Sequence, residues 1–304
     1  VGRDYLNDMK PMKAALFMSH GFNDWNVMPE HSYRIYKKAE EMGLPVKIYY
    51  HQYGHGGPPP LSMMNKWFTK YLFGIDNGIE KGPKAWIVRE NDKNDNPTPY
   101  ADYPNPDAQK VTLHLKATSK NEGMLTLEKS KKQGTQTLID NYNFSGDDLA
   151  KSESSNHRLL FVTSILKEDL HLSGLTKLNI KLASSKPAAN LSVWMVSLPW
   201  NKNKNAKITD NIITRGWADP QNYKSISESE PLKPGKFYEM SFDLIPDDQV
   251  IPAGQQIGLM IFSSDNQFTL LPEPGTELTV DLDETTIEIP VVGGKEKFKN
   301  AASD

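Results

Sequence analysis

The chain has 304 residues, of which 38% are hydrophobic and 10% aromatic, so it can bury a sizeable core and its length favours two domains. The 35 Lys and Arg residues against 38 Asp and Glu give a formal net charge of -3, and no apolar run approaches the roughly 18 residues of a membrane-spanning helix. We therefore expect neither a nucleic acid nor a membrane as partner. The absence of cysteine excludes disulfides, thiol nucleophiles and thiolate metal sites, but leaves the cellular compartment open.

The first part of the chain, residues 1–78, alternates apolar runs of strand length with amphipathic segments of helical period. The run at 14–18 ends in a polar loop, and Pro29 then suits the first turn of a helix that Gly43 ends. The predicted elements, in chain order, are a strand at 14–18, a helix at 29–43, a strand at 46–50 and a helix at 61–74. Since strands separated by helices pair in parallel, this part is α/β.

The second part, residues 79–292, contains short alternating segments with turn signals between them and no amphipathic helix. The predicted strands lie at 86–88, 111–115, 124–127, 159–163, 178–182, 193–198, 237–244, 257–262, 278–282 and 287–292. Such a series is typical of an antiparallel β-sandwich, here of jelly-roll type. We place the boundary near 78–83, predict a long loop at 91–107, and expect a polar, frayed tail at 293–304.

Candidate reactive residues follow the two strands of the first part. In open α/β sheets such residues collect on loops beyond the carboxyl ends of the strands. Asp24 follows the first predicted strand, and His55 follows the second, which is the chain order of acid and histidine in an α/β-hydrolase triad. The carboxylate would hold the imidazole in the right tautomer, while the imidazole takes the proton of a serine hydroxyl. Glycines on both sides of His55 permit a tight loop that brings the ring to the catalytic centre.

Ordinary structural roles compete with this interpretation. An Asp in a loop after a strand is more often an Asx turn or a helix cap. His51 and His55 lie four apart, but in a glycine-rich loop without a helix or Glu, so we expect no metal site. His20, beside the strand end, is expected to make structural hydrogen bonds. Ser19 lacks the first glycine of a nucleophile elbow and lies on the strand that carries the acid, so the candidate triad has no nucleophile here.

Two segments point to a family. Residues 20–27, His-Gly-Phe-Asn-Asp-Trp-Asn-Val, and residues 51–55, His-Gln-Tyr-Gly-His, resemble the catalytic acid and histidine segments of the Xaa-Pro dipeptidyl-peptidases and the related cocaine-esterase-like acyl hydrolases. The Asp-Trp-Asn-Val string favours the dipeptidyl-peptidases. That family joins an α/β-hydrolase domain to a C-terminal jelly-roll sandwich, and the segments 174–182, 191–196 and 214–219 resemble that sandwich. The similarity covers residues 13–292.

The resemblance implies that Asp24 is the triad acid and His55 the general base of a serine hydrolase that releases Xaa-Pro dipeptides from peptide N-termini. Residues 1–78 would be the C-terminal part of the α/β-hydrolase catalytic domain. The serine nucleophile would lie on a segment upstream of Val1, which the chain would need as a partner, beside a peptide substrate with proline at the second position. No cofactor or metal is implied, and a homo-oligomer is compatible with this reading.

Two other functions stay open. The same machinery would serve an ester or an amide without proline, because the acyl pocket would lie mostly outside this chain. The other alternative is a non-catalytic β-sandwich binding module, in which aromatic side chains stack on carbohydrate, although such residues in strands are more often core. The candidate side chains for that role are Trp86, Trp194, Trp200 and Trp217.

Overall fold

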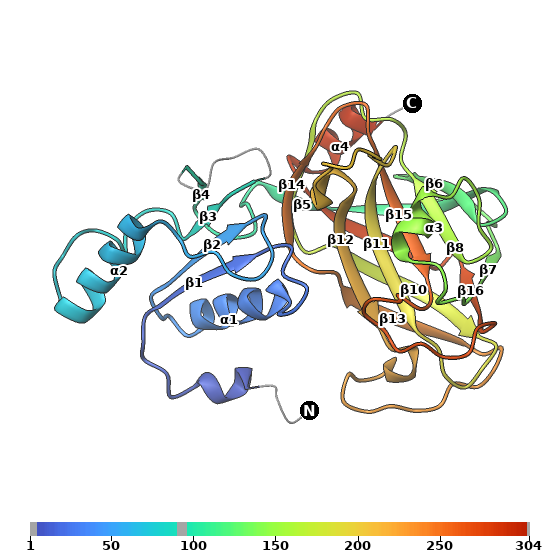
Figure 1. Ribbon diagram of the computed structural model, residues 1–304, viewed down its shortest axis with the longest axis horizontal. Helices are drawn as coiled ribbons and strands as arrows, with labels where there is room; N and C mark the ends of the chain where they lie inside the picture. The colour runs from blue at the N-terminus through green and yellow to red at the C-terminus, as the bar shows by residue number, and fades with distance from the viewer. Residues whose placement is uncertain (1–4, 90–95, 303–304) are drawn as a thin grey trace. The chain divides into compact units, whose positions relative to one another are not determined.

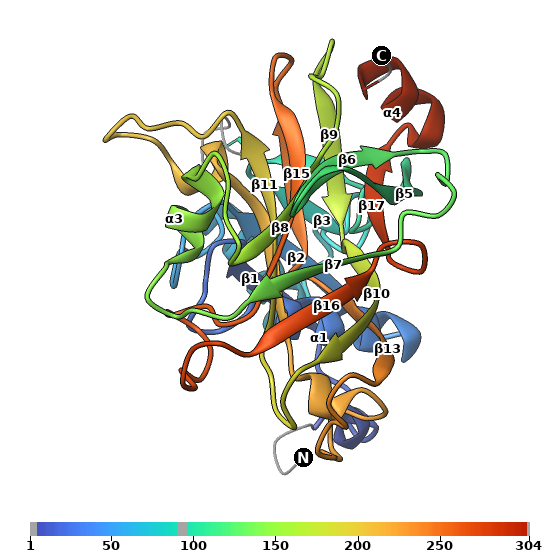
Figure 2. The ribbon, with the colours of Figure 1, turned by 90° about the vertical axis from the view of Figure 1, so that its right-hand side faces the viewer.

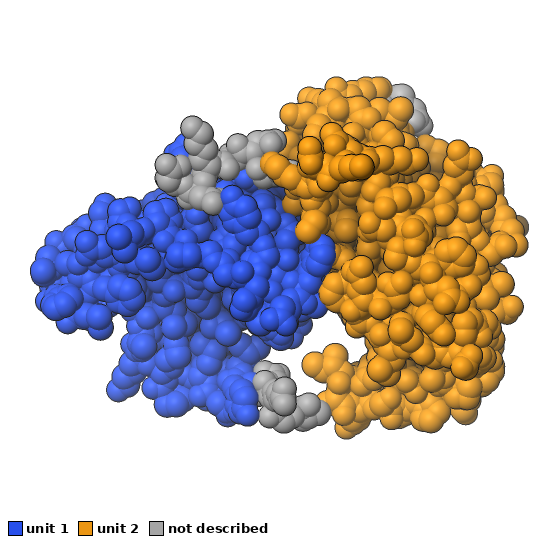
Figure 3. Space-filling model, in the orientation of Figure 1, with its two compact units in different colours: residues 1–106, 245–249 blue, residues 107–244, 250–304 orange. Residues whose placement is uncertain are grey.

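A computed structural model describes residues 5–89 and 96–302 of the chain. Contacts divide it into two compact units (Figures 1 and 3): unit 1 comprises residues 1–106 and 245–249, and unit 2 comprises residues 107–244 and 250–304. Unit 1 is α/β, and the regular secondary structure of unit 2 is mostly β-strand, so the predicted combination of an α/β part with an all-β part is confirmed. Among the described residues, no helix combines the length and the apolar character needed to cross a membrane.

Unit 1 is built on a four-stranded sheet with the order β1-β2-β3-β4. Its strands are β1 (Leu16–Gly21), β2 (Val46–His51), β3 (Ala85–Ile87) and β4 (Thr98–Tyr100). The first three strands are parallel, and β4 is antiparallel to β3. Because β1 and β2 pair in parallel, with Gly21 opposite His51, the loops that follow them leave the same edge of the sheet.

The helices of unit 1 begin and end where the sequence predicts. The short 3-10 helix η1 (Leu6–Met9) precedes β1, α1 (Pro29–Glu41) connects β1 to β2, and α2 (Leu61–Phe73) follows β2. Pro29 occupies the first turn of α1, where its missing N–H costs nothing, and Tyr36 and Ala39 bury the inner face of that helix. Gly74 ends α2 in the left-handed conformation, at a φ of 69°.

Most of the apolar face of α2 is exposed. Trp67 is the buried residue of this helix, and its ring centre lies 5.5 Å from that of Phe17 on β1. The other large apolar side chains face solvent within unit 1: Leu61, Phe68, Leu72 and Phe73 are 77%, 53%, 71% and 75% exposed. The helical period identified an apolar stripe, but the described residues of unit 1 leave most of it uncovered.

The division between the units falls after Pro106, later in the chain than the boundary predicted near 78–83. The Tyr100 hydroxyl donates to Asp248 Oδ1 at 3.1 Å, and the Tyr103 hydroxyl donates to the Asp247 carbonyl at 2.9 Å. These bonds within unit 1 span more than a hundred residues of sequence, so local patterns could not reveal them. Strand β4 lies inside the predicted loop 91–107, of which residues 91–95 are outside the described part of the chain.

The strands of unit 2 belong to a 13-stranded sheet in the described part of the chain (Figure 2). They are β5 (Ala108–Ser119), β6 (Glu122–Thr126), β7 (Thr135–Ile139), β8 (Arg158–Val162), β9 (Leu170–Gly174), β10 (Lys177–Ser184), β11 (Leu191–Leu198), β12 (Ile212–Ala218), β13 (Phe237–Asp243), β14 (Asp247–Ile251, which begins in unit 1), β15 (Gln256–Phe262), β16 (Glu277–Asp281) and β17 (Thr286–Val292). Most neighbours are antiparallel, whereas β6 and β8 are parallel. Inward aliphatic side chains from these strands form one extensive hydrophobic core.

Several elements of unit 2 were not predicted. Strands β7, β9, β12 and β14 have no counterpart among the expected ones. The loops also contain two short 3-10 helices, η2 (Ile208–Asp210) and η3 (Pro220–Asn222), and helix α3 (Gly146–Lys151). The expected frayed tail is instead helix α4 (Gly294–Ala302), which packs against β5 and β17. Phe298 and Ala301 are buried there at 2% and 0% exposure, and their burial explains why a largely polar segment is ordered.

Candidate active site

The two loops that leave the carboxyl edge of β1 and β2 are tied together by their backbones. Phe22 N–H donates to the His51 carbonyl at 2.7 Å, and Asn23 N–H donates to the Tyr53 carbonyl at 3.2 Å. The approach is close at Gly21, where any Cβ would collide with the backbone oxygens of Tyr53 and Gly54. Glycine at position 21 therefore allows the loop after β2 to lie directly against the loop after β1.

Asp24 lies in the first of these loops and is 3% exposed. Its Oδ1 accepts from the N–H groups of Asn26 and Val27 at 3.1 and 3.0 Å, which is the geometry of an Asx turn. Its Oδ2 lies 2.9 Å from His55 Nδ1. The Asx turn and the contact with histidine, which are alternative readings of the sequence, are thus both present and use different oxygens.

These contacts set the charge of the carboxyl group. Burial by itself would raise the pKa of Asp24, but the hydrogen bonds from Val27, from His55 and from the Asn26 backbone outweigh that effect. The pKa therefore lies below its usual value, and the group is a carboxylate at neutral pH. A carboxylate can only accept hydrogen bonds, so the proton between it and His55 is on Nδ1 of the imidazole.

The imidazole of His55 is held at one nitrogen and open at the other. Its side chain is 67% exposed, while the Asp24 side chain behind it is 4% exposed. With Nδ1 protonated, Nε2 carries the lone pair and can accept a proton from a reacting group. In residues 5–89 and 96–302, no serine hydroxyl is hydrogen-bonded to this ring. The structure thus brings together the two predicted residues, an oriented imidazole and its carboxylate.

His51 and Ser19, which were also weighed from the sequence, make structural hydrogen bonds outside the Asp24–His55 pair. His51 is 2% exposed: its Nδ1 accepts from Tyr53 N–H and its Nε2 donates to the Gly57 carbonyl, both at 3.2 Å. Burial is the main reason that the pKa of His51 is lowered, so its ring is neutral and braces the loop. The Ser19 hydroxyl donates to the Gly57 carbonyl at 2.7 Å. Across the described ranges, no three or more acidic, His or Cys side chains are grouped so as to hold a metal ion.

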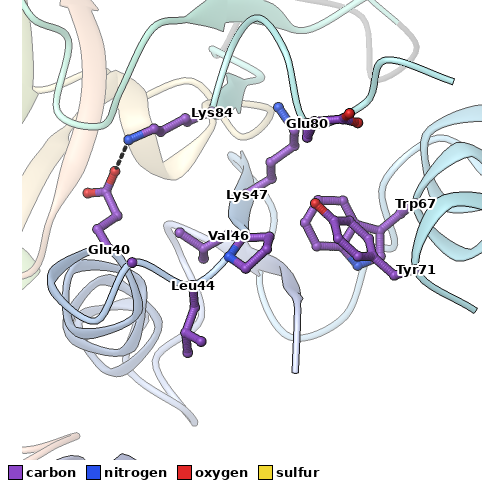
Figure 4. A pocket seen from close by; sticks show the side chains of 10 residues that line it. Glu40, Leu44, Val46, Lys47, Trp67, Tyr71, Glu80 and Lys84 are labelled. Carbon is purple, nitrogen blue, oxygen red and sulfur yellow. Dashed lines mark hydrogen bonds and ion pairs between the residues drawn. The ribbon is translucent and has the colours of Figure 1, made fainter. Parts of the chain in front are cut away.

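A cavity of roughly 270 Å³ lies at the amino end of β2, the end opposite to His51 and the His55 loop (Figure 4). Lys47 is the buried charge beside it: its Nζ donates to the Pro83 carbonyl at 2.5 Å and lies 4.9 Å from the centre of the Trp86 ring. Burial is the main reason that the pKa of Lys47 is lowered. The cavity is lined by Glu40, Gly43, Leu44, Pro45, Val46, Lys47, Trp67, Tyr71, Glu80 and Lys84. Its place on the strand separates it from the Asp24–His55 pair.

The tryptophans proposed for carbohydrate stacking are partly or fully covered. Trp194 is 2% exposed, and its Nε1 donates to Asp265 Oδ2 at 3.1 Å. Trp217 donates to the same oxygen at 3.1 Å, and the Arg215 guanidinium lies 4.7 Å from the centre of the Trp194 ring. Trp194 is therefore a core residue without a free face. Trp86, Trp200 and Trp217 are half-buried.

One contact of the site was not foreseen. His20, expected to make structural hydrogen bonds, has its Nε2 3.3 Å from Asp24 Oδ2, the oxygen that also contacts His55. The available signal was the spacing of four residues between His20 and Asp24, which has no defined meaning in a loop that follows a strand. The acceptor role of Asp24 toward backbone N–H groups was likewise visible only as a general tendency of Asp in loops.

Comparison with protein families finds two matches along the chain. The model of the X-Pro dipeptidyl-peptidase C-terminal non-catalytic domain matches residues 77–299, and that of the X-Pro dipeptidyl-peptidase (S15 family) matches residues 1–57. A protein of Rhodopirellula baltica named "Putative Xaa-Pro dipeptidyl-peptidase" is 56% identical over 292 residues, which are 96% of this chain and 47% of that protein. The Xaa-Pro dipeptidyl-peptidase of Lacticaseibacillus rhamnosus is 28% identical over 95% of this chain and 41% of its own length.

Solved structures share the fold at low identity. An aminopeptidase from a marine sediment Thaumarchaeota archaeon has a TM-score of 0.71 and 17% identity over 93% of this chain and 56% of its own. A CocE/NonD family hydrolase from Staphylococcus aureus has a TM-score of 0.69 and 12% identity over 93% of this chain and 55% of its own. The chain thus spans about half the length of the relatives it matches. Because the C-terminal domain model alone covers most of the chain, the chain belongs to the X-Pro dipeptidyl-peptidase family.

Proposed function

We propose that this chain is the C-terminal portion of a serine peptidase that releases Xaa-Pro dipeptides from peptide N-termini, and that it supplies the acid and the histidine of the triad. The observation that carries the proposal is the 2.9 Å contact between buried Asp24 Oδ2 and His55 Nδ1. It lies at the carboxyl edge of parallel strands, where α/β folds carry their chemistry. The names of the relatives support the substrate class.

The reaction would follow the logic of a serine triad. A serine on an upstream segment attacks the carbonyl carbon of proline while His55 Nε2 takes the hydroxyl proton, and Asp24 stabilises the imidazolium. The imidazolium then protonates the departing amine as the peptide bond breaks, leaving an acyl-enzyme. Water attacks the acyl carbon with His55 again as base, which frees the dipeptide and restores the serine. Unit 2 would be a non-catalytic sandwich of jelly-roll type.

The test uses the complete protein that contains this chain. We expect His55→Ala to abolish hydrolysis of a Gly-Pro anilide, since no other described group is oriented by Asp24 in the same way. His31→Ala is the matched control, because His31 is exposed on α1 and, among the described residues, it is hydrogen-bonded through its backbone N–H to the Met28 carbonyl. Wild-type turnover in the His55 variant would contradict the assignment.

A second candidate is an acyl hydrolase that acts on esters or on amides without proline. The observation in its favour is that the fold is shared with a CocE/NonD family hydrolase and with an α-amino acid ester hydrolase, at TM-scores of 0.69 and 0.65. The same Asp24–His55 pair would serve either substrate. Comparing kcat/KM of the complete protein on a Gly-Pro anilide and on a simple aryl ester separates the two: a preference for the anilide supports the peptidase.

A further inference from the structure

His20 stands behind the candidate triad acid with both ring nitrogens engaged. It lies near the carboxyl end of β1, and its side chain is 10% exposed. Its Nε2 is 2.7 Å from the Val27 carbonyl oxygen, and its Nδ1 is 2.6 Å from Ser32 Oγ on α1. Its ring also stacks on Tyr50 of β2, with centres 6.5 Å apart and planes at 26°. The imidazole is therefore held by the strand, the loop and the helix around it.

The partners determine the tautomer of this ring. A carbonyl oxygen only accepts, so His20 Nε2 carries a proton and donates it to Val27. In the neutral ring, Nδ1 accepts from the Ser32 hydroxyl. The same nitrogen lies 3.3 Å from Asp24 Oδ2, so its N–H dipole is close to the carboxylate. Ser32 thus orients a ring whose opposite nitrogen faces the candidate acid.

These contacts form a closed cycle that includes Asp24. His20 donates to the Val27 carbonyl, Val27 N–H donates to Asp24 Oδ1, and Asp24 Oδ2 faces His20 Nε2 again. The carboxylate cannot turn without breaking the Val27 bond or moving the backbone that His20 holds. Since Oδ2 is also the oxygen that contacts His55, the orientation of the His55 imidazole depends on this cycle of contacts.

We propose that His20 is a positioning residue of the Asp24–His55 pair: it fixes the Val27 backbone and the rotation of the Asp24 carboxylate, and so the direction of the His55 imidazole. It does not touch the substrate in this role. The inference rests on the proposed function only in requiring that Asp24 and His55 activate a serine; it does not depend on specificity for proline.

The test compares two substitutions in the complete protein. His20→Leu removes both ring nitrogens, whereas His20→Gln keeps an amide N–H toward Val27 and an oxygen toward Ser32. The readouts are the rate of serine labelling by a fluorophosphonate probe and the kcat and KM for a Gly-Pro anilide. We expect His20→Leu to lower the labelling rate and kcat by about 10- to 100-fold with KM nearly unchanged, and His20→Gln to recover most of that loss. His31→Leu, on exposed α1 surface, is the control.

The outcomes are distinct. A labelling rate in His20→Leu equal to that of wild type overturns the inference, as does an equal loss in the Leu and Gln variants when thermal unfolding shows both to be folded. A wild-type protein that labels but does not cleave the Gly-Pro anilide contradicts the proposed function, while the labelling comparison still decides the role of His20. A wild-type protein that does neither overturns both.

Discussion

A single methyl group added at Gly21 should disturb the candidate active site by displacing the loop that carries His55. Gly21 ends β1, and the backbone of the loop after β2 lies directly over its Cα. A Cβ built there would be 2.5 Å from the Gly54 carbonyl oxygen, and still closer to that of Tyr53. Both neighbours are backbone atoms, so no side-chain rotation can relieve the clash, and Gly21→Ala must move the loop that carries His55.

The size of that movement follows from ordinary contact distances. Ordinary Cβ contacts begin at 3.4 Å, so the Gly54 carbonyl must retreat by about 1 Å and the Tyr53 carbonyl by more. Overpacking of this kind costs about 1–3 kcal/mol of stability. A misplacement of about 1 Å in a catalytic group can cost on the order of 100-fold in rate. We therefore expect Gly21→Ala to reduce the kcat of the complete protein by about 10- to 100-fold.

The measurement is kcat for a Gly-Pro anilide together with urea unfolding of the variant. Gly54→Ala is the matched control, because it adds a methyl group to the same loop but meets its nearest neighbour in the described structure, the Asn23 carbonyl oxygen, at an ordinary 3.5 Å. Wild-type kcat in Gly21→Ala would refute the reasoning, because the loop would then have absorbed the clash without moving His55. Equal damage from both substitutions would show that the loop tolerates no side chain, and the argument from distance would fail.

Four further predictions concern separate parts of the chain. Asp24→Asn should leave the fold intact but lower kcat of the complete protein by about 10⁴-fold, because an amide N–H facing His55 favours the wrong tautomer; a loss under tenfold would contradict this. The pKa of His51 is lowered mainly by burial, so its neutral ring contributes fully to stability above about pH 6.5, and this contribution is lost as the pH falls toward the folded pKa. His51→Gln should therefore reduce the drop in unfolding free energy between about pH 7.5 and about pH 5.5, measured by urea unfolding. An unchanged drop would assign it to other groups. Phe298→Ala should destabilise unit 2 by about 3–5 kcal/mol in chemical unfolding, whereas Lys299→Ala on exposed α4 surface should change little; equal effects would contradict the packing of this helix. This chain by itself should associate through the exposed apolar face of α2, and Leu72→Lys should shift its sedimentation toward monomer; a wild-type chain that stays monomeric at all concentrations would contradict this.

Local chemistry in the sequence determined most of unit 1. Pro29 and Gly74 mark helix ends by backbone constraints that act within a few residues. A compact apolar run predicted β1, and the alternation of apolar residues predicted β2. The order of Asp24 and His55 after two parallel strands made them candidates, and the resemblance of their segments to a known family led us to predict that they meet. Each of these inferences needs only neighbouring residues and the direction of a strand.

The tertiary structure alone decided which segments share a unit and which faces are covered. Asp247 and Asp248 accept hydrogen bonds from Tyr103 and Tyr100, and no local pattern links residues so far apart in the chain. The apolar stripe of α2 is exposed and the polar tail is a docked helix, because burial depends on the partner surface and not on the period of a segment. The contact of His20 with Asp24 was likewise decided by the tertiary structure. The loop after β1 folds back so that His20 reaches both Val27 and Asp24, and the spacing of these residues in the sequence does not encode that path.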